Sequence, residues 1–299
     1  MNTPASDSDK ERWLGYLSAT VTSITWGLQA IALKFAIHSI PLITVVWFRL
    51  TFAFVFLVLF LKHQAPESLK ILKSPPLGTI IAAFFLAINY HTFLLGLDMT
   101  SPSAAQVMIQ SGPYGLAIFS FFYFKERLTK ISFAGFLLVP FGMYLFFRDE
   151  FGTGNIWVLV SGIAWAIYSI YQKLLTKNLH PNQILLVVFA ATSLFFLPIG
   201  HPTNLISWGA REWTIMTVLG LFTVIGYCGL GLALAKAPAS QVSIIISCNP
   251  LITIFLMQGL AKIHLAPVTE SIRSLGYIGA LLVALGVSLA LSSGAKTTK

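Results

Sequence analysis

Apolar stretches of about 20 residues constrain the fold of this chain more than any other feature of its sequence. Spanning the hydrocarbon of a bilayer takes about 20 residues of α-helix, which bonds its own backbone polar groups. Short polar turns separate ten such stretches, so the sequence predicts an all-α polytopic membrane protein with ten transmembrane helices. The predicted spans are 13–36, 41–61, 77–97, 102–124, 131–147, 155–176, 182–200, 213–235, 238–261 and 271–292.

Composition agrees with a membrane protein and argues against a nucleic-acid partner. Hydrophobic residues make up 56% of the chain and charged residues only 10%, whereas soluble domains carry about 25% charged residues. The formal net charge is +9, but the cations lie in short loops and form no basic stripe beside stacking aromatic residues. The expected partners are the lipid bilayer and a small molecule, and the expected assembly is a monomer.

The distribution of Lys and Arg predicts the orientation. Cytoplasmic loops of membrane proteins carry an excess of these residues. With the N-terminus placed in the cytoplasm, thirteen Lys and Arg residues lie inside and four outside, and two lie within spans. The sequence therefore predicts that both the N-terminus and the C-terminus are cytoplasmic.

An internal repeat divides the ten spans into five and five. Trp26 precedes Lys34 by eight residues, and Trp165 precedes Lys173 by the same separation, 139 residues later. The fifth and tenth spans share a Gly-x6-Gly pattern, at 135–142 and 279–286. Because five is odd, the second copy must enter the membrane from the opposite side, which predicts two inverted five-helix repeats around a central cavity. The predicted repeats are 1–150 and 151–299.

Several of these motifs resemble the drug/metabolite transporter superfamily. A Trp-containing first span and Arg49 in the second are similar to that superfamily, and three further patterns resemble its EamA family. These are the Ser-Ala-Ala pattern ending in Pro at 101–113, the run Lys-Glu-Arg-Leu-Thr at 125–129, and the Gly-x6-Gly of the fifth span. The resemblance implies a ten-helix basket around a central cavity. It also implies transport of amino acids, other small metabolites or toxic compounds, and we expect the bacterial inner membrane as the location.

Acidic residues are absent from the middle of every predicted span. All ten lie in tails, loops or helix ends. A buried carboxylate relay for protons is therefore not expected, nor is a strongly cationic substrate, which would lack a counter-charge. Motifs of metalloproteases, α/β-hydrolases and P-loop enzymes are also missing, so we expect no catalysis, no metal and no cofactor.

Polar and aromatic faces of the spans supply the candidate binding residues. Trp26 and Gln29 share a helix face, as do Trp165 and Tyr168. A stripe spaced i, i+4 and i+8 begins at Gln106. Such faces either line a cavity or form hydrogen bonds between helices, and the sequence leaves both open. The predicted substrate-binding residues are Trp26, Gln29, Asn89, His91, Gln106, Gln110, Tyr114, Trp165, Tyr168, Ser243 and Ser247.

Three ionisable residues within or beside the spans have alternative roles. Arg49 either contacts a substrate carboxylate or a gate, or is a structural residue bonded to carbonyls or to Asp98. Lys34 either extends its ammonium to the membrane surface or forms a gate pair with Asp98. His91 is the central group with an ordinary pKa near neutrality, and it either binds substrate or protons or is a satisfied structural residue.

These features together predict a secondary transporter that works by alternating access. The expected solute is zwitterionic or weakly anionic and partly apolar, which fits amino acids, aromatic ones included. The alternatives are an exporter of amphiphilic drugs or other toxic compounds, and a membrane sensor or scaffold that transports nothing.

Overall fold

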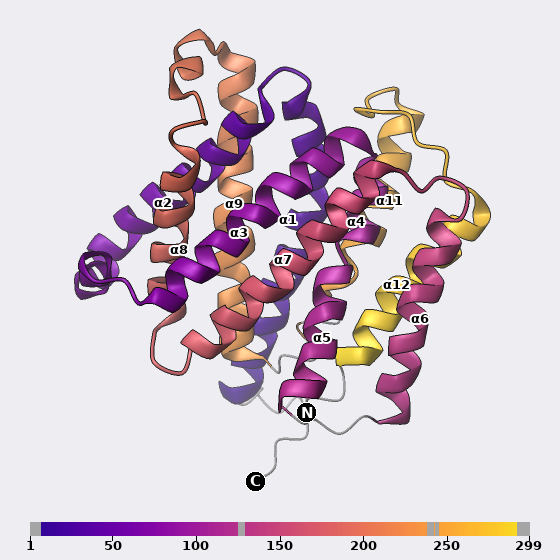
Figure 1. Cartoon of the computed structure of the whole chain (residues 1–299), viewed down its shortest axis with the longest axis horizontal. Coiled ribbons are helices and arrows are strands. Elements are labelled where there is room, and N and C mark those ends of the chain that lie inside the picture. The colour runs from indigo at the N-terminus through magenta and orange to yellow at the C-terminus, as the bar shows by residue number, and fades with distance from the viewer. Residues whose placement is uncertain (1–6, 125–128, 238–241, 243–244, 292–299) are drawn as a thin grey trace, which may run out of the picture.

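The fold is a bundle of helices, seen in a computed structural model that describes residues 7–124, 129–237, 242 and 245–291. These residues contain α-helices, two short 3₁₀-helices and no strand, which confirms the all-α prediction (Figure 1). The α-helices are α1 (Asp7–Ile37), α2 (Leu42–Gln64), α3 (Leu77–Met99), α4 (Pro102–Met108), α5 (Ser111–Phe124), α6 (Lys130–Phe147), α7 (Thr153–Leu175), α8 (Pro181–Phe196), α9 (Ala210–Lys236), α11 (Asn249–Lys262) and α12 (Ser274–Leu291). The 3₁₀-helices are η1 (Pro66–Lys73) and η2 (Pro202–Ser207).

Six helices within the described residues are long and apolar enough to cross a membrane, namely α1, α2, α3, α6, α7 and α9. Helices α8 and α12 are apolar but shorter. The remaining two predicted spans, 102–124 and 238–261, do not form single long helices in the described part of the chain. Helix α11 starts only at Asn249, and residues 238–241 and 243–244 lie outside the described residues.

The predicted span 102–124 is divided into α4 and α5 because of Pro113. Proline lacks a backbone N–H and its ring clashes with the carbonyl four residues earlier, so an unbroken helix cannot run through this position unstrained. The carbonyl of Ile109 is instead bonded by the N–H of Gly112, at 2.9 Å, which makes a tighter turn. Helix α5 then starts at Ser111 and places Pro113 in its first turn, where the missing N–H costs nothing.

Small residues allow two helix pairs to approach closely. A Cβ atom added to Gly142 would lie 2.7 Å from the carbonyl oxygen of Gly279, and one added to Gly279 would lie 2.6 Å from that of Gly142. The Gly-x6-Gly patterns of the fifth and tenth predicted spans therefore face each other across the α6–α12 contact. Helices α3 and α7 also pack closely, where Gly96 meets Gly154. Such contacts are typical of helices packed within membranes.

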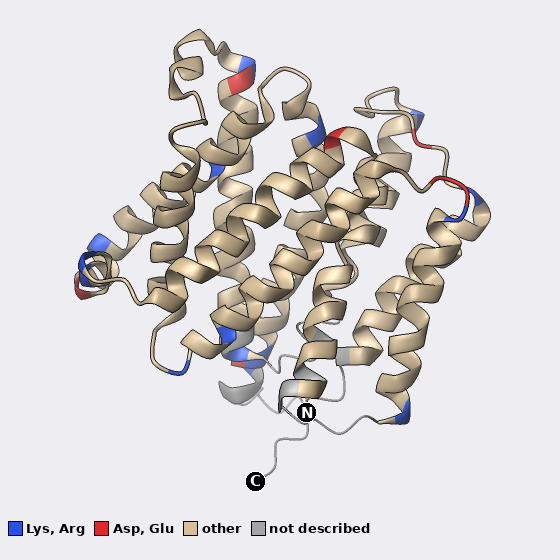
Figure 2. Ribbon diagram, viewed as in Figure 1, with Lys and Arg blue, Asp and Glu red and all other residues tan. Residues whose placement is uncertain are grey.

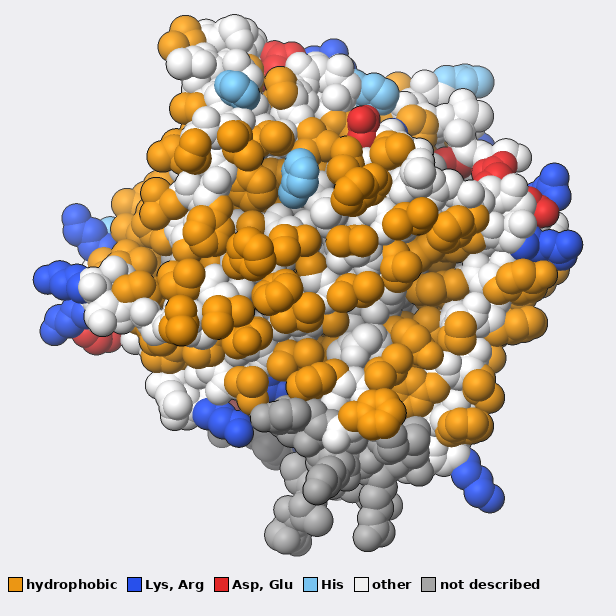
Figure 3. Space-filling view, in the orientation of Figure 1, with side chains coloured by type: hydrophobic (Ala, Val, Ile, Leu, Met, Phe, Trp, Pro, Cys, Tyr) orange, Lys and Arg blue, Asp and Glu red, His pale blue; other side chains and the backbone are white. Residues whose placement is uncertain are grey.

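The surface is apolar around the middle of the bundle and charged at its edges. Figure 3 shows hydrophobic side chains covering the centre of one face, and Figure 2 shows most Lys, Arg, Asp and Glu residues at the helix ends and in loops. Large exposed side chains include Phe84, Phe133, Phe141 and Phe255. Water would not tolerate so large an apolar area, but lipid does. Together with the six long apolar helices, this surface identifies an integral membrane protein.

Candidate functional site

A cavity of about 120 Å³ lies where helices from the first and second halves of the chain meet. Polar amides and aromatic rings make up most of its wall, with one charged residue. The lining residues are Trp26, Gln29, Ala30, Arg49, Asn89, Tyr90, Phe93, Gln106, Ile109, Gln110, Pro113, Trp165, Tyr227, Ile246 and Asn249. We call this space the central cavity.

The α1 wall is held in place by contacts with α4 and α9. The amide Nε2 of Gln106 donates to the backbone oxygen of Trp26 at 2.7 Å. The Trp26 indole meets the Tyr227 ring edge-on, with ring centroids 5.9 Å apart. Gly226 provides the space for this indole, because a Cβ there would collide with its Nε1 atom. These contacts orient the Trp26 side chain in the conformation described.

Two amides bridge the halves of the chain at the break between α4 and α5. The Nε2 atom of Gln110 donates to Oδ1 of Asn249, at the start of α11, at 2.7 Å. The Oε1 atom of Gln110 is buried and has no hydrogen-bond partner among the described residues, and the same holds for Oε1 of Gln29. Buried polar atoms are normally bonded. Both residues line the cavity, and their unpartnered amide oxygens remain able to accept hydrogen bonds.

Asn89 joins α3 to α7 beside the cavity. Its Nδ2 atom donates to the hydroxyl of Ser161 at 2.8 Å and to the backbone oxygen of Ser161 at 3.1 Å. The Ser161 hydroxyl in turn donates to the backbone oxygen of Asn89. These bonds satisfy the Asn89 amide nitrogen within the protein, and Trp165, one turn further along α7, completes this side of the wall.

Arg49 is the one charged residue on the cavity wall, and only 1% of it is exposed. Its Nε atom donates to the hydroxyl of Thr223 on α9 at 3.2 Å. Its Cζ atom lies 4.8 Å from the centroid of the Tyr90 ring, which is a cation–π contact. Its Nη2 atom is buried and has no hydrogen-bond partner among the described residues. The structure places neither a backbone carbonyl nor Asp98 against this side chain in the hydrogen bonds it shows.

Four predicted binding residues lie outside the cavity lining. His91 lies near Phe196 of α8, with ring centroids 6.3 Å apart. The Tyr114 hydroxyl donates to the backbone oxygen of Phe136 on α6 at 2.9 Å, because the helix break turns it away from Gln106 and Gln110. Tyr168 is buried behind Tyr227. Ser247 shares a hydrogen bond with Ser288 of α12 at 2.7 Å. One more predicted binding residue, Ser243, lies outside the described residues.

The side chain of Lys34, from α1, is buried against the C-terminal end of α3. It reaches Asp98, but it bonds the backbone oxygen of that residue and not its carboxylate. Its ammonium donates to the oxygens of Leu97, Asp98 and Thr100 at 2.7, 2.7 and 2.8 Å. Helices end with unsatisfied carbonyls, and a cation there completes them. The ammonium thus stays inside the protein, whereas the sequence suggested extension to the surface or a pair with the carboxylate.

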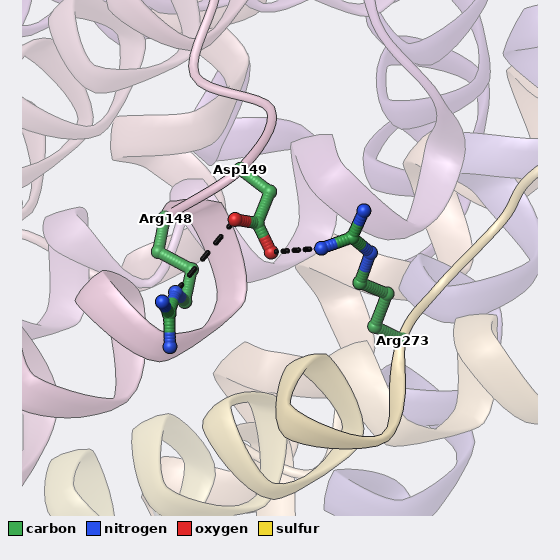
Figure 4. Close-up of polar contacts among 3 residues, drawn as sticks. All are labelled: Arg148, Asp149 and Arg273. Carbon is green, nitrogen blue, oxygen red and sulfur yellow. Dashed lines mark hydrogen bonds and ion pairs between the residues drawn. The ribbon is translucent and has the colours of Figure 1, made fainter.

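Glu270 completes the other side of the same turn. Its carboxylate accepts from the backbone N–H of Ser103 at 3.0 Å and from the Ser103 hydroxyl at 2.5 Å. We call Lys34, residues 97–103 and Glu270 the turn clamp. Nearby, Asp149 forms ion pairs with Arg273 at 2.9 Å and with Arg148 at 3.7 Å (Figure 4). Both pairs are exposed, whereas in the turn clamp Lys34 and Ser103 are buried and Glu270 is half-buried.

Tyr90 and Tyr227 are cavity residues that the sequence analysis did not select. Aromatic residues are common in membrane helices, so their type alone carries little information. Their spacing was the available signal: they are 137 residues apart, as are Pro113 and Pro250. No group of three or more His, Cys, Asp and Glu side chains that would suit a metal ion occurs among the described residues.

Comparison with known proteins agrees with the helical fold and assigns the family. A Haemophilus influenzae protein named "Uncharacterized transporter" is 30% identical, covering 92% of this chain and 94% of that protein. The Escherichia coli "Uncharacterized inner membrane transporter YhbE" is 28% identical, covering 91% and 89%. An Escherichia coli "Probable amino-acid metabolite efflux pump" is 24% identical, covering 90% and 92%.

A solved crystal structure has the same fold, with a TM-score of 0.68 at 15% identity, covering 96% of this chain and all of that one. The profile of the EamA-like transporter family matches residues 13–148 and again residues 152–292. The chain belongs to the EamA-like transporter family.

Proposed function

We propose that this protein is a secondary transporter of small organic metabolites, with amino acids, aromatic ones included, as the substrate class. The observation that carries the proposal is the central cavity, which combines unpartnered amide oxygens, aromatic rings and one cation where the two halves of the chain meet. Convergent polar groups in an otherwise apolar wall are typical of small-molecule sites. The "amino-acid metabolite efflux" in the name of the Escherichia coli relative agrees with this class.

The proposed architecture is ten membrane-crossing segments in two inverted repeats, 1–150 and 151–299. Two separate matches of the family profile support this division. The helix contacts support it as well. If α1, α2, α3 and α6 correspond to α7, α8, α9 and α12, the α1–α9 contact becomes the α7–α3 contact, and both pairs pack closely. The α2–α8 and α6–α12 contacts map onto themselves. A two-fold relation of this kind would allow one half to rock against the other around a fixed site.

The proposed location is the bacterial inner membrane, with both termini in the cytoplasm. The relative named an inner membrane transporter supports the location. The loop distribution of Lys and Arg supports the orientation. The start of α1 and the end of α12 lie toward the lower side of the bundle in Figure 1. An even number of crossings brings both termini to one side of the membrane.

The size of the cavity suggests which substrates fit the conformation described. A cavity of about 150 Å³ accommodates benzene, and the central cavity measures about 120 Å³. A small amino acid fits that volume more readily than an aromatic one. Aromatic substrates would therefore need the walls around Trp26 and Trp165 to move apart, as they would in alternating access.

Transport can be tested with purified protein in liposomes. We expect uptake of labelled L-alanine, L-threonine or L-phenylalanine above that of empty liposomes. Gln110→Leu should reduce uptake, because it removes an amide from the cavity wall. Gln64→Leu, the same substitution at the exposed end of α2, should leave uptake unchanged. The proposal would be refuted by a folded protein that takes up none of the labelled amino acids and shows no thermal shift with a panel of metabolites.

A further inference from the structure

The charge of Arg49 lacks a counter-ion in the part of the chain that the structure describes. Among the described residues, no carboxylate forms an ion pair with it, and its only hydrogen bond goes to the neutral hydroxyl of Thr223. All ten acidic residues of the sequence lie in tails, loops or helix ends, whereas Arg49 lies within α2. The imbalance is therefore built into the sequence.

A buried cation without a partner is unfavourable, because the protein interior solvates charge poorly. Arginine has five N–H donors in a fixed fork. One long hydrogen bond and the face of Tyr90 occupy part of that fork, but Nη2 remains without a partner. An intramembrane charge of this kind most often marks a functional site. Because Arg49 also lines the central cavity, the missing partner can be a ligand.

A carboxylate is the anion that fits this fork best. Its two oxygens accept two parallel N–H bonds from one guanidinium, which adds directional bonding to charge neutralisation. The ring of Tyr90 covers the guanidinium and limits the direction from which an anion can approach. Thr223 is already bonded to the backbone oxygen of Leu219 at 2.9 Å, so its hydroxyl is fixed in position.

The remaining wall of the cavity offers acceptors and no charge. The Oε1 atoms of Gln29 and Gln110 have no partner among the described residues, and both residues line the cavity. Amide oxygens accept hydrogen bonds from an ammonium group without carrying a full negative charge. An acidic residue there would pair with Arg49 and remove its need for a ligand. The wall thus suits a molecule that carries its own anion and its own cation.

We propose that the central cavity recognises the two charges of a zwitterion separately. Arg49 holds the carboxylate of the solute between Tyr90 and Thr223, while Gln29 and Gln110 accept hydrogen bonds from its ammonium group. This inference rests on the proposed function, because it assigns an orientation to the substrate of that same cavity. It also predicts a selectivity: an amine that lacks a carboxylate leaves Arg49 unpaired and adds a second cation beside it.

Wild-type protein alone can decide this selectivity. Binding would be measured by calorimetry in detergent with L-alanine, L-threonine and L-phenylalanine, and with the C-terminal amide of each. The amides keep the size, the side chain and the ammonium group and lose only the carboxylate. For every amino acid that binds, we expect the corresponding amide to bind roughly thirtyfold more weakly, or not at all. Equal affinities of acid and amide would overturn the inference and leave the proposed function intact. Binding of none of the six probes would overturn both.

Variants of Arg49 then test whether this residue is responsible. Arg49→Gln should weaken binding of the amino acid roughly thirtyfold and remove the preference for acid over amide. Arg49→Lys should keep the preference in part, because an ammonium retains the charge but not the fork. Lys62→Gln, at the exposed end of the same helix, should change neither affinity. A folded Arg49→Gln protein that still prefers acids to amides would overturn the assignment.

Discussion

Two buried cationic side chains of this bundle differ in their hydrogen-bond partners. Lys34 is 4% exposed and donates to three backbone oxygens within 2.8 Å. Arg49 is 1% exposed and has, within the part of the chain that the structure describes, one hydrogen bond at 3.2 Å and no partner for Nη2. The carbonyls at the end of α3 provide for the first charge, and the protein leaves the second unsatisfied. From this difference we propose that Lys34 maintains the fold and that Arg49 is available to a ligand. Substitutions at both residues should separate these roles.

The largest loss of stability is expected for Lys34→Met. The substitution removes three charge-assisted hydrogen bonds and leaves carbonyls at the end of α3 unsatisfied. We expect the free energy of unfolding to fall by about 2–4 kcal/mol. Circular dichroism during denaturant titration in detergent would measure it. Lys62→Met, at the exposed end of α2, should have little effect. Equal losses for both variants would argue against a structural role specific to Lys34.

Glu270→Gln should have the next largest effect. The amide of glutamine still offers one oxygen to Ser103, but it lacks the charge that strengthens both bonds, and its NH₂ group faces a donor. We expect a loss of about 1–2 kcal/mol in the same unfolding measurement. Glu212→Gln is the matched control, because Glu212 accepts the N–H of Gly209 at an exposed helix start. If Glu212→Gln lowers the free energy of unfolding as much as Glu270→Gln does, the position of Glu270 in the turn clamp adds nothing to stability.

Arg49→Met should change stability by no more than about 1 kcal/mol, and a gain is compatible with the account. Replacing a poorly paired buried charge by an apolar side chain of similar length is often neutral or stabilising. Thr223 loses one partner but keeps its bond to Leu219. Thermal unfolding in detergent without ligand would measure the change. A loss as large as that of Lys34→Met would show that Arg49 supports the fold and would remove the contrast between the two cations.

The smallest effect is expected for Asp149→Asn. The ion pair of Asp149 with Arg273 is exposed (Figure 4), so water and salt screen it. We expect a loss of less than about 1 kcal/mol, decreasing further in high salt. Unfolding of the variant and the wild type at low and high ionic strength would check this. A larger loss that does not depend on salt would show that this pair belongs with the turn clamp.

The sequence predicted those features of the fold and site that depend on local pattern. Apolar length predicted the long helices, and the repeated glycine patterns predicted that the fifth and tenth spans correspond. That these two helices pack against each other at Gly142 and Gly279 was not predicted from the sequence. The faces that begin at Trp26 and Gln106 were selected by helical spacing, and the structure places both residues on the cavity wall. Arg49 was selected because a charge within a span is unusual.

Features that depend on packing between distant segments could not be predicted from local sequence pattern. Lys34 reaches oxygens that are 63 to 66 residues away in the sequence, so its partners could not be deduced from its position. The break before Pro113 moves Tyr114 off the predicted stripe, because the stripe assumed an unbroken helix. His91 lies well inside its predicted span, 77–97, but the rotation of α3 about its axis places the imidazole beside Phe196. Rotation about a helix axis is set by neighbours and leaves little trace in local spacing.

The most direct test of the account is an experimental structure of the protein with a bound amino acid. We expect density for the ligand in the central cavity, with its carboxylate within about 3.2 Å of Nη2 of Arg49 and its ammonium group within hydrogen-bond distance of Gln29 or Gln110. Lys34 should keep its three backbone acceptors in the same structure. A ligand bound in the cavity with its carboxylate directed away from Arg49, or bound elsewhere in the protein, would contradict the account.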